Sequence, residues 1–176
     1  LARWLDSGDD VGLLSEAGCP AIADPGATLV KRAHEAGIQV VPLVGPSSIV
    51  LSLMASGLNG QRFAFSGYLP QAATERDPRI LELEGRSRRL DQTEIFIEAP
   101  YRNDQLFRAI TANCQPDTLL CLAVDLTGPT EHIQTKTIRA WQQSPAPILH
   151  KRPTVFLLFA GQARSPNRRV RAANAH

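Results

Sequence analysis

The 176-residue chain has few of the residues that mark secreted, metal-binding or membrane-spanning proteins. Its three cysteines are far apart, which argues against a disulfide framework and suits the reducing cytoplasm. Its four histidines are scattered, so we expect no metal site. No apolar run approaches the length that spans a bilayer, and no signal peptide is recognisable. We therefore expect a cytoplasmic protein that is not bound to a membrane.

Aromatic residues are also scarce, at 6% of the chain, and positive charge is concentrated at one end. The formal net charge is +2, but the last part of the chain supplies it through Arg164, Arg168, Arg169 and Arg171. Because the remainder is slightly acidic, the composition does not indicate a globally basic RNA-binding surface. We interpret residues 162–176 as a disordered, solvated tail; the alternative is an arm that contacts phosphates.

Two turns rich in glycine and proline each follow a short apolar segment. The first turn, residues 15–26, follows residues 11–14, and the second, residues 44–48, follows residues 38–43. We predict that both apolar segments are strands and that each turn opens a helix. Loops at the carboxyl ends of strands line the ligand crevice of an open α/β sheet. Two such turns on successive strands predict a nucleotide-like ligand.

Residues around these turns carry helix-start and helix-stop signals. We expect Asp24 to cap the first helix, with the proline after it in the first helical position, and Gly37 to end it. Ser47 or Ser48 can cap the second helix, which we expect to end at Gly57. The Asn-Gly pair that follows predicts a domain boundary near residue 60.

The remainder, residues 61–161, reads as a second α/β domain with strands separated by amphipathic helices. The helix expected before residue 90 carries five arginines between residues 76 and 89, which form a solvated face or meet RNA phosphates. The proline-rich stretch 145–153 is expected to be a loop. We predict strands at 63–65, 95–97, 119–126, 131–137 and 154–159, and a helix at 103–113.

Four motifs together resemble the tetrapyrrole methylase superfamily. They are Ser-Glu-Ala-Gly-Cys-Pro at 15–20, Pro-Leu-Val-Gly-Pro-Ser-Ser at 42–48, Phe-Ser-Gly-Tyr-Leu-Pro at 65–70 and Glu-Ala-Pro-Tyr-Arg at 98–102. Within that superfamily they look most like the small-subunit ribosomal RNA 2′-O-ribose methyltransferases. The resemblance runs from about residue 11 to about residue 161.

The resemblance implies an α/β fold of two domains, with a partial doubly wound domain (1–60) followed by a mixed-sheet domain (61–161). It also implies methyl transfer from S-adenosylmethionine to ribosomal RNA ribose, and a homodimer. The alternatives are a methyltransferase for a tetrapyrrole or other small molecule, and a truncated, non-catalytic remnant. Because family members carry further elements before the first motif, we expect that about the first third of the family domain, including one wall of the cofactor site, is missing here.

The resemblance further implies a set of cofactor contacts. The first loop would lie along the methionine and ribose, the second would bind the carboxylate or amine, and the later residues would border the pocket and the adenine. For the serines the alternative is ordinary helix capping, and for Tyr68 it is packing between the domains. The candidate contacts are Ala17, Gly18, Cys19, Pro20, Gly45, Ser47, Ser48, Tyr68, Thr127 and Thr154.

The only candidate for catalysis is Glu98, which follows a predicted strand and could act as a base for a ribose hydroxyl. The alternative is that Glu98 pairs with Arg102, which lies four residues later at a helix start. Transfer of a methyl group from a sulfonium requires alignment of three atoms and exclusion of water, so no nucleophilic side chain is needed.

Overall fold

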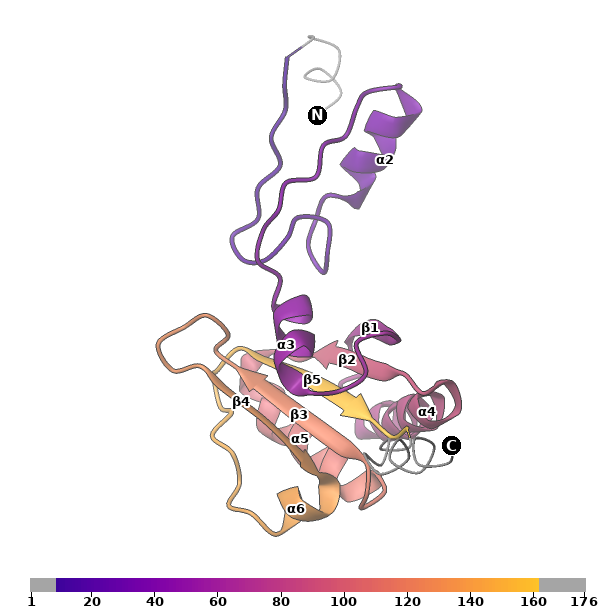
Figure 1. Ribbon diagram of the computed structural model, residues 1–176, viewed down its shortest axis with the longest axis vertical. Helices are drawn as coiled ribbons and strands as arrows, with labels where there is room; N and C mark the ends of the chain where they lie inside the picture. Colours follow the sequence, from indigo (N-terminus) through magenta and orange to yellow (C-terminus); the bar gives the residue numbers. More distant parts are fainter. Residues whose placement is uncertain (1–8, 162–176) are drawn as a thin grey trace, which may run out of the picture.

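The computed structural model describes residues 9–161, which form a five-stranded sheet domain and an N-terminal extension (Figure 1). The sheet order is β1-β2-β5-β3-β4. Strands β1 and β2 are parallel and joined by a helix, whereas the other neighbours are antiparallel, so the sheet is mixed. The strands are β1 (Phe63–Tyr68), β2 (Thr93–Ile97), β3 (Leu119–Val124), β4 (His132–Thr137) and β5 (Thr154–Phe159).

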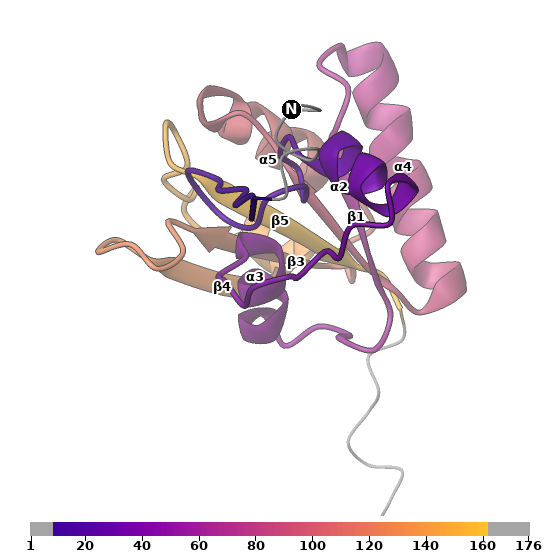
Figure 2. The same cartoon turned by 90° about the horizontal axis from the view of Figure 1, so that it is seen from above.

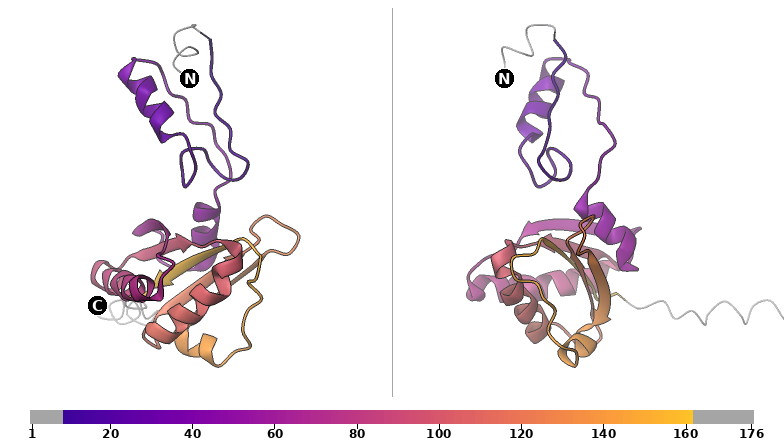
Figure 3. Two further views of the ribbon diagram at one scale, coloured as in Figure 1. Left: turned by 180° about the vertical axis from the view of Figure 1, so that it is seen from behind. Right: turned by 90° about the vertical axis from the view of Figure 1, so that its left-hand side faces the viewer.

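Helices cover both faces of this sheet (Figures 1 and 3). The larger core lies on one face, where side chains such as Leu83, Ile110 and Trp141 from three helices pack with Phe96 and Phe156 from the strands. On the other face Ile49 packs in a smaller cluster. The helices are α2 (Ala27–Glu35), α3 (Ser48–Ser56), α4 (Ala73–Leu90), the 3-10 helix η1 (Pro100–Arg102), α5 (Asn103–Asn113) and α6 (Ile138–Gln142).

The burial of the strands explains why the second domain was predictable. All six residues of β5 are buried, as its uninterrupted apolar run indicates for a central strand covered on both faces. Strand β4 is an edge strand, and its polar sequence with Lys136 is typical of an edge that must not pair with another chain. The predicted mixed sheet is confirmed, as are the bounds of α5 and β5.

The N-terminal extension, residues 9–47, is here called the arm and projects from the sheet domain (Figures 1 and 2). The predicted strands at 11–14 and 38–43 are wrong: neither segment forms a strand within residues 9–161. A strand needs a neighbouring strand to which its backbone can hydrogen-bond, and no sheet pairing of these segments occurs among the described residues. Leu14 is 92% exposed and Leu43 is 87% exposed.

The first helix also starts later than predicted. Helix α2 begins at Ala27, with Gly26 at the N-cap in a conformation (φ 145°) that favours glycine. The carboxylate of Asp24 does not cap the helix but accepts a hydrogen bond from the Ser15 hydroxyl, which closes the loop between them. Gly37 follows the helix end in the left-handed region, as a stop signal predicts.

Helix α3 connects the arm to the sheet. Ser47 is its N-cap, but its side chain makes no capping hydrogen bond, so only the position was predicted correctly. The helix ends at Gly57, which is left-handed (φ 71°), as expected. Although the predicted boundary near residue 60 assigns α3 to the first domain, α3 packs on the sheet of the second, where the Thr135 hydroxyl donates to the Ser56 carbonyl at 2.7 Å. The predicted tail, 162–176, lies outside the described residues.

The arginine-rich helix α4 is tied to acidic residues rather than uniformly solvated. The most buried of these carboxylates, Glu94, is inaccessible to solvent and receives two hydrogen bonds from Arg86. Most of the positive charge on this helix is therefore matched within the fold. The ion pairs are Arg76–Asp77, Arg79–Glu82, Arg86–Glu94 and Arg88–Glu84.

Candidate functional site

Most of the later candidate residues lie at one end of the strands, where β1, β2 and β3 end and β5 begins. We call this end of the sheet the rim, and it consists of Tyr68, residues 98–102, residues 125–127 and residues 151–154. The strand register places them there, because Tyr68 pairs with Ile97, Ile97 with Val155, and Val155 with Ala123 in one continuous row. Residues that follow this row in β2 and β3, or precede it in β5, share the rim.

The two predicted cofactor loops meet at the end of the arm nearest α3 (Figure 1). The Cys19 thiol donates to the Pro46 carbonyl at 3.4 Å and lies 3.8 Å from the Gly45 carbonyl oxygen. Gly18 is in the left-handed region (φ 77°), and a Cβ at Gly18 or Gly45 would meet no atom within 4 Å. Both loops therefore present backbone to open space, which is what close approach of a ligand requires.

The remaining candidates of the first loop are placed with Cys19: Ala17 is exposed and Pro20 is half-buried. Ser47 and Ser48 stand at the junction of the arm and α3, where the positive end of the helix dipole favours an anionic group. The structure thus brings the candidates into two groups. Residues 17–20 and 45–48 belong to the arm and its junction, and Tyr68, Thr127 and Thr154 belong to the rim.

The two rim threonines are already engaged in the fold. The backbone N–H of Thr127 donates to the Glu131 carboxylate at 2.7 Å, and its hydroxyl donates to the Leu126 carbonyl. The Thr154 side chain is buried and donates to the Arg152 carbonyl at 3.0 Å. A contact from Thr127 to a ligand would therefore use the acceptor capacity of its carbonyl or hydroxyl oxygen, and the buried Thr154 supports the rim.

The rim is built from strained backbone that one arginine holds in place. Asp125, Thr127 and Lys151 all have positive φ, between 50° and 65°. Arg152 ties these turns together: its Nε donates to the Asp125 carboxylate at 2.7 Å and its Nη2 to the Thr130 carbonyl at 2.5 Å. Non-glycine residues in this region are costly and cluster at functional sites.

We call the contacts of Arg152 with Asp125 and Thr130 the Arg152 clip, and charge and further hydrogen bonds strengthen it. The Thr130 hydroxyl, followed by Arg152, lowers the pKa of the Asp125 carboxyl, so Asp125 stays ionised. From below, the buried Asn103 amide donates to the Arg152 carbonyl at 2.7 Å, while its own Oδ1 is buried without a partner. The sequence analysis did not identify Arg152 or Asn103 as site residues. Both hydrogen-bond to carbonyl oxygens far away in the chain, and no local motif predicts such a contact.

Glu98 pairs with Arg102, as the alternative interpretation held. Its Oε1 accepts from the backbone N–H of Ala99 at 2.7 Å and from Arg102 Nη2 at 2.7 Å and Nε at 3.0 Å. The Glu98 side chain is 3% exposed, so the ion pair is largely shielded from water on the acidic side. This arrangement fixes the guanidinium of Arg102 at the end of β2.

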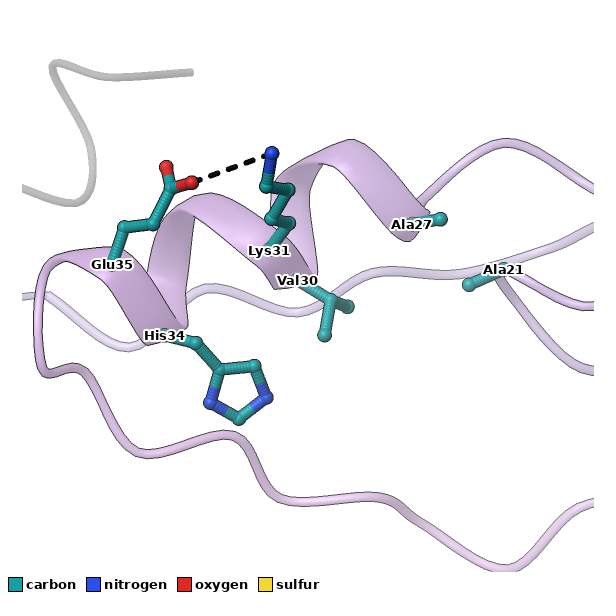
Figure 4. Close-up of a pocket in the computed structure, with 6 residues that line it drawn as sticks. All are labelled: Ala21, Ala27, Val30, Lys31, His34 and Glu35. Atoms are coloured by element: carbon teal, nitrogen blue, oxygen red, sulfur yellow. Dashed lines mark ion pairs between the residues drawn. The ribbon is translucent and has the colours of Figure 1, made fainter.

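A hollow of the arm lies elsewhere, along α2 (Figure 4). It is open and mostly apolar, with Val30 and His34 pointing into it and the Lys31–Glu35 ion pair along the helix. None of the predicted contact residues lines it. Between residues 9 and 161 the structure contains no cluster of metal-ligating side chains, and no helix there is long and apolar enough to cross a membrane.

Comparison with known proteins gives sequence relatives of one kind. The chain is 38% identical over 134 residues to ribosomal RNA small subunit methyltransferase I of Vibrio cholerae, which covers 76% of this chain and 45% of that protein. The protein of the same name from Xylella fastidiosa is 34% identical over 155 residues, covering 88% and 55%. That of Bacillus subtilis is 37% identical over 138 residues, covering 78% and 46%. The chain thus spans about half the length of these relatives.

Among solved structures, the methyltransferase CobJ superposes with a TM-score of 0.53 at 18% identity, covering 81% of this chain and 61% of that chain. This likeness shows the fold. No protein-family model matches the chain. The chain shares the fold of CobJ, and its sequence is similar to about half the length of ribosomal RNA small subunit methyltransferase I proteins.

Proposed function

We propose that this chain takes part in methyl transfer from S-adenosylmethionine to a ribose of small-subunit ribosomal RNA. The observation that carries the proposal is the 34–38% identity, over 134 residues or more, to proteins named ribosomal RNA small subunit methyltransferase I. The choice of ribose as acceptor rests on the motif resemblance alone. The contact between the 17–20 and 45–48 loops supports it, because two loops that join through Cys19 can face one ligand. Because CobJ is only 18% identical to this chain, the likeness to it does not favour a tetrapyrrole as the substrate here.

The chemistry asks little of the side chains. When bound, S-adenosylmethionine would supply an activated methyl group. A ribose hydroxyl oxygen would bond to that methyl carbon as its bond to sulfur breaks, and the hydroxyl proton would pass to a base, for which Glu98 is the candidate. The proposed cofactor contacts are the backbone of Ala17 to Pro20 and the Gly45 to Ser48 junction. The junction offers hydroxyls and the α3 N-terminus to the carboxylate of the methionine part. The rim then lies on the sheet side, where the acceptor must approach.

Gly18 gives the test of the cofactor loops. Gly18→Val places a branched side chain where the backbone is left-handed and open, so we expect binding of S-adenosylmethionine to weaken at least about tenfold while the sheet domain stays folded. Gly12→Val is the matched control, because Gly12 lies in the same arm with equal space and no positive φ. Isothermal calorimetry measures both. Equal affinity in the two folded variants would remove this loop from the site.

Glu98 remains the proposed base, and its pairing with Arg102 makes the test informative. Glu98→Gln removes the proton acceptor but keeps the size and most hydrogen-bonding capacity of the side chain. A base predicts loss of methyl transfer with unchanged cofactor affinity, whereas a purely structural partner predicts lower thermal stability with residual transfer. Methyl transfer to small ribosomal subunits, assayed with a radiolabelled methyl donor, distinguishes the two results.

We also propose that the protein works as a homodimer in the cytoplasm, where its ribosomal substrate is found. The arm supports association, since it carries exposed apolar side chains such as Leu14 and Val44. Light scattering of the purified chain tests this. A monomer that binds S-adenosylmethionine at micromolar affinity would contradict the dimer.

A further inference from the structure

Both tyrosines of the chain lie together on the rim. Tyr68 ends β1 and pairs with Ile97, directly before the 98–102 turn that contains Tyr101. The two residues are 62% and 63% exposed, which is unusual for large aromatic side chains in a chain with so few of them. Exposed aromatic groups gathered at one site mark a binding surface.

Arg102 holds Tyr101 in place without offering a free charge, whereas Tyr68 is placed by the pairing of β1 with β2. Its Nη1 donates to the Tyr101 hydroxyl at 3.2 Å, and its guanidinium carbon lies 5.1 Å from the Tyr101 ring centroid. Its other donors are fixed on Glu98. Because the Glu98 carboxylate neutralises the guanidinium, the site is suited to a flat, uncharged partner rather than to a phosphate.

We propose that Tyr68 and Tyr101 form a stacking platform for an unpaired nucleobase of the RNA acceptor. The inference rests on the proposed function for its choice of ligand. Single-stranded RNA is recognised by stacking of splayed bases on aromatic side chains, and a pre-ordered ring loses less entropy on binding. Placed at the carboxyl end of β1 and β2, the platform holds a base beside the 125–127 and 151–154 turns.

The experiment measures binding of a short fluorescein-labelled single-stranded RNA to the 176-residue chain by anisotropy. Tyr68→Ala and Tyr101→Ala are each expected to weaken binding about fivefold or more, and the Tyr→Phe variants by less than about twofold. The slope of log Kd against log salt should not change, because stacking releases no counterions. Phe63→Ala is the control, since Phe63 is also exposed but lies at the opposite end of β1.

The possible outcomes separate this proposal from the proposed function. Loss of RNA affinity in both alanine variants, with calorimetric S-adenosylmethionine binding unchanged in Tyr101→Ala, supports the platform. RNA affinity equal to that of the unmodified chain, no RNA binding by the unmodified chain, or a reduced salt slope overturns it. If the unmodified chain binds RNA through the tyrosines but neither binds S-adenosylmethionine nor methylates, the platform stands and the proposed function fails.

Discussion

The ion pair between Arg86 of α4 and Glu94 of β2 makes a sharp prediction about what holds the sheet domain together. Glu94 has no solvent exposure, and its two carboxylate oxygens accept from Nε and Nη2 of Arg86, the Nε contact being 2.7 Å. The same Nη2 donates to the Ser66 hydroxyl at 3.0 Å, so the guanidinium links α4 to both parallel strands. The hydrogen bond to Glu94 raises the pKa of Arg86, which keeps it charged.

Arg86→Met keeps most of the side-chain volume but leaves a buried carboxylate whose other side-chain donor is Gln92, at 3.0 Å. Breaking a buried pair from one side costs about 3–5 kcal/mol, because the remaining charge is desolvated and unpaired. For a chain of this size each kcal/mol lowers Tm by about 2–4 °C, so we expect Tm to fall by about 6–20 °C. The Tm of Arg86→Lys should lie between those of the unmodified chain and Arg86→Met, because an ammonium group cannot make the bidentate contact of the guanidinium.

Urea unfolding followed by fluorescence of the buried Trp141 measures the loss. One further result is expected. The double variant Arg86→Met with Glu94→Leu should regain much of the stability, because the carboxylate that Arg86→Met leaves without its partner is then absent. A loss under about 1 kcal/mol at neutral pH would refute the reasoning, as it is the value of an exposed pair.

Two other predictions concern the rim and the cysteines. Hydrogen bonding, chiefly from Thr130, lowers the pKa of Asp125. A lowered carboxyl pKa gives stability that is present above the unfolded pKa of about 3.9 and is lost as the pH falls through the folded pKa. The urea midpoint should therefore fall more steeply with acid pH in the unmodified chain than in Asp125→Asn, and parallel plots of midpoint against pH would contradict the Arg152 clip. Burial raises the pKa of Cys114 to about 12. At pH 8 a thiol reagent should therefore label Cys19 in the native chain and reach the buried Cys114 only on unfolding. Rapid labelling of Cys114 in the native chain, measured by peptide mass spectrometry, would contradict this.

The sequence predicted elements best where a local pattern and a packed environment agree. The apolar stripe of residues 103–113 matches α5, and the apolar run of residues 154–159 matches β5. A buried helix face and a central strand both require apolar residues at regular positions in their own sequence, so the local pattern indicates them. The segment 38–43 has a similar apolar character, yet it joins no sheet within residues 9–161. Strand formation depends on a neighbour that the local pattern does not specify.

Contacts between distant residues were beyond a local reading. The arginines of α4 look like a solvated face by spacing, but Arg86 reaches a carboxylate eight positions away on a strand. Asn103 binds the carbonyl of Arg152, 49 residues later. The Glu98–Arg102 pair, by contrast, was foreseen as an alternative, since four residues separate the partners at a helix start and that spacing brings side chains together.

The structure divides the proposed work between two parts of different construction. The rim is over-determined: Arg152 and Asn103 hold three residues of strained backbone, and Glu98 holds Arg102 against Tyr101. The arm loops are joined to each other by little more than the Cys19 thiol, and they leave the backbone at Gly18 and Gly45 open. A methyl acceptor must be held still for in-line attack, whereas a cofactor must enter and leave at every turnover. A rigid rim for the RNA and an adaptable pair of loops for S-adenosylmethionine is the assignment that meets both needs.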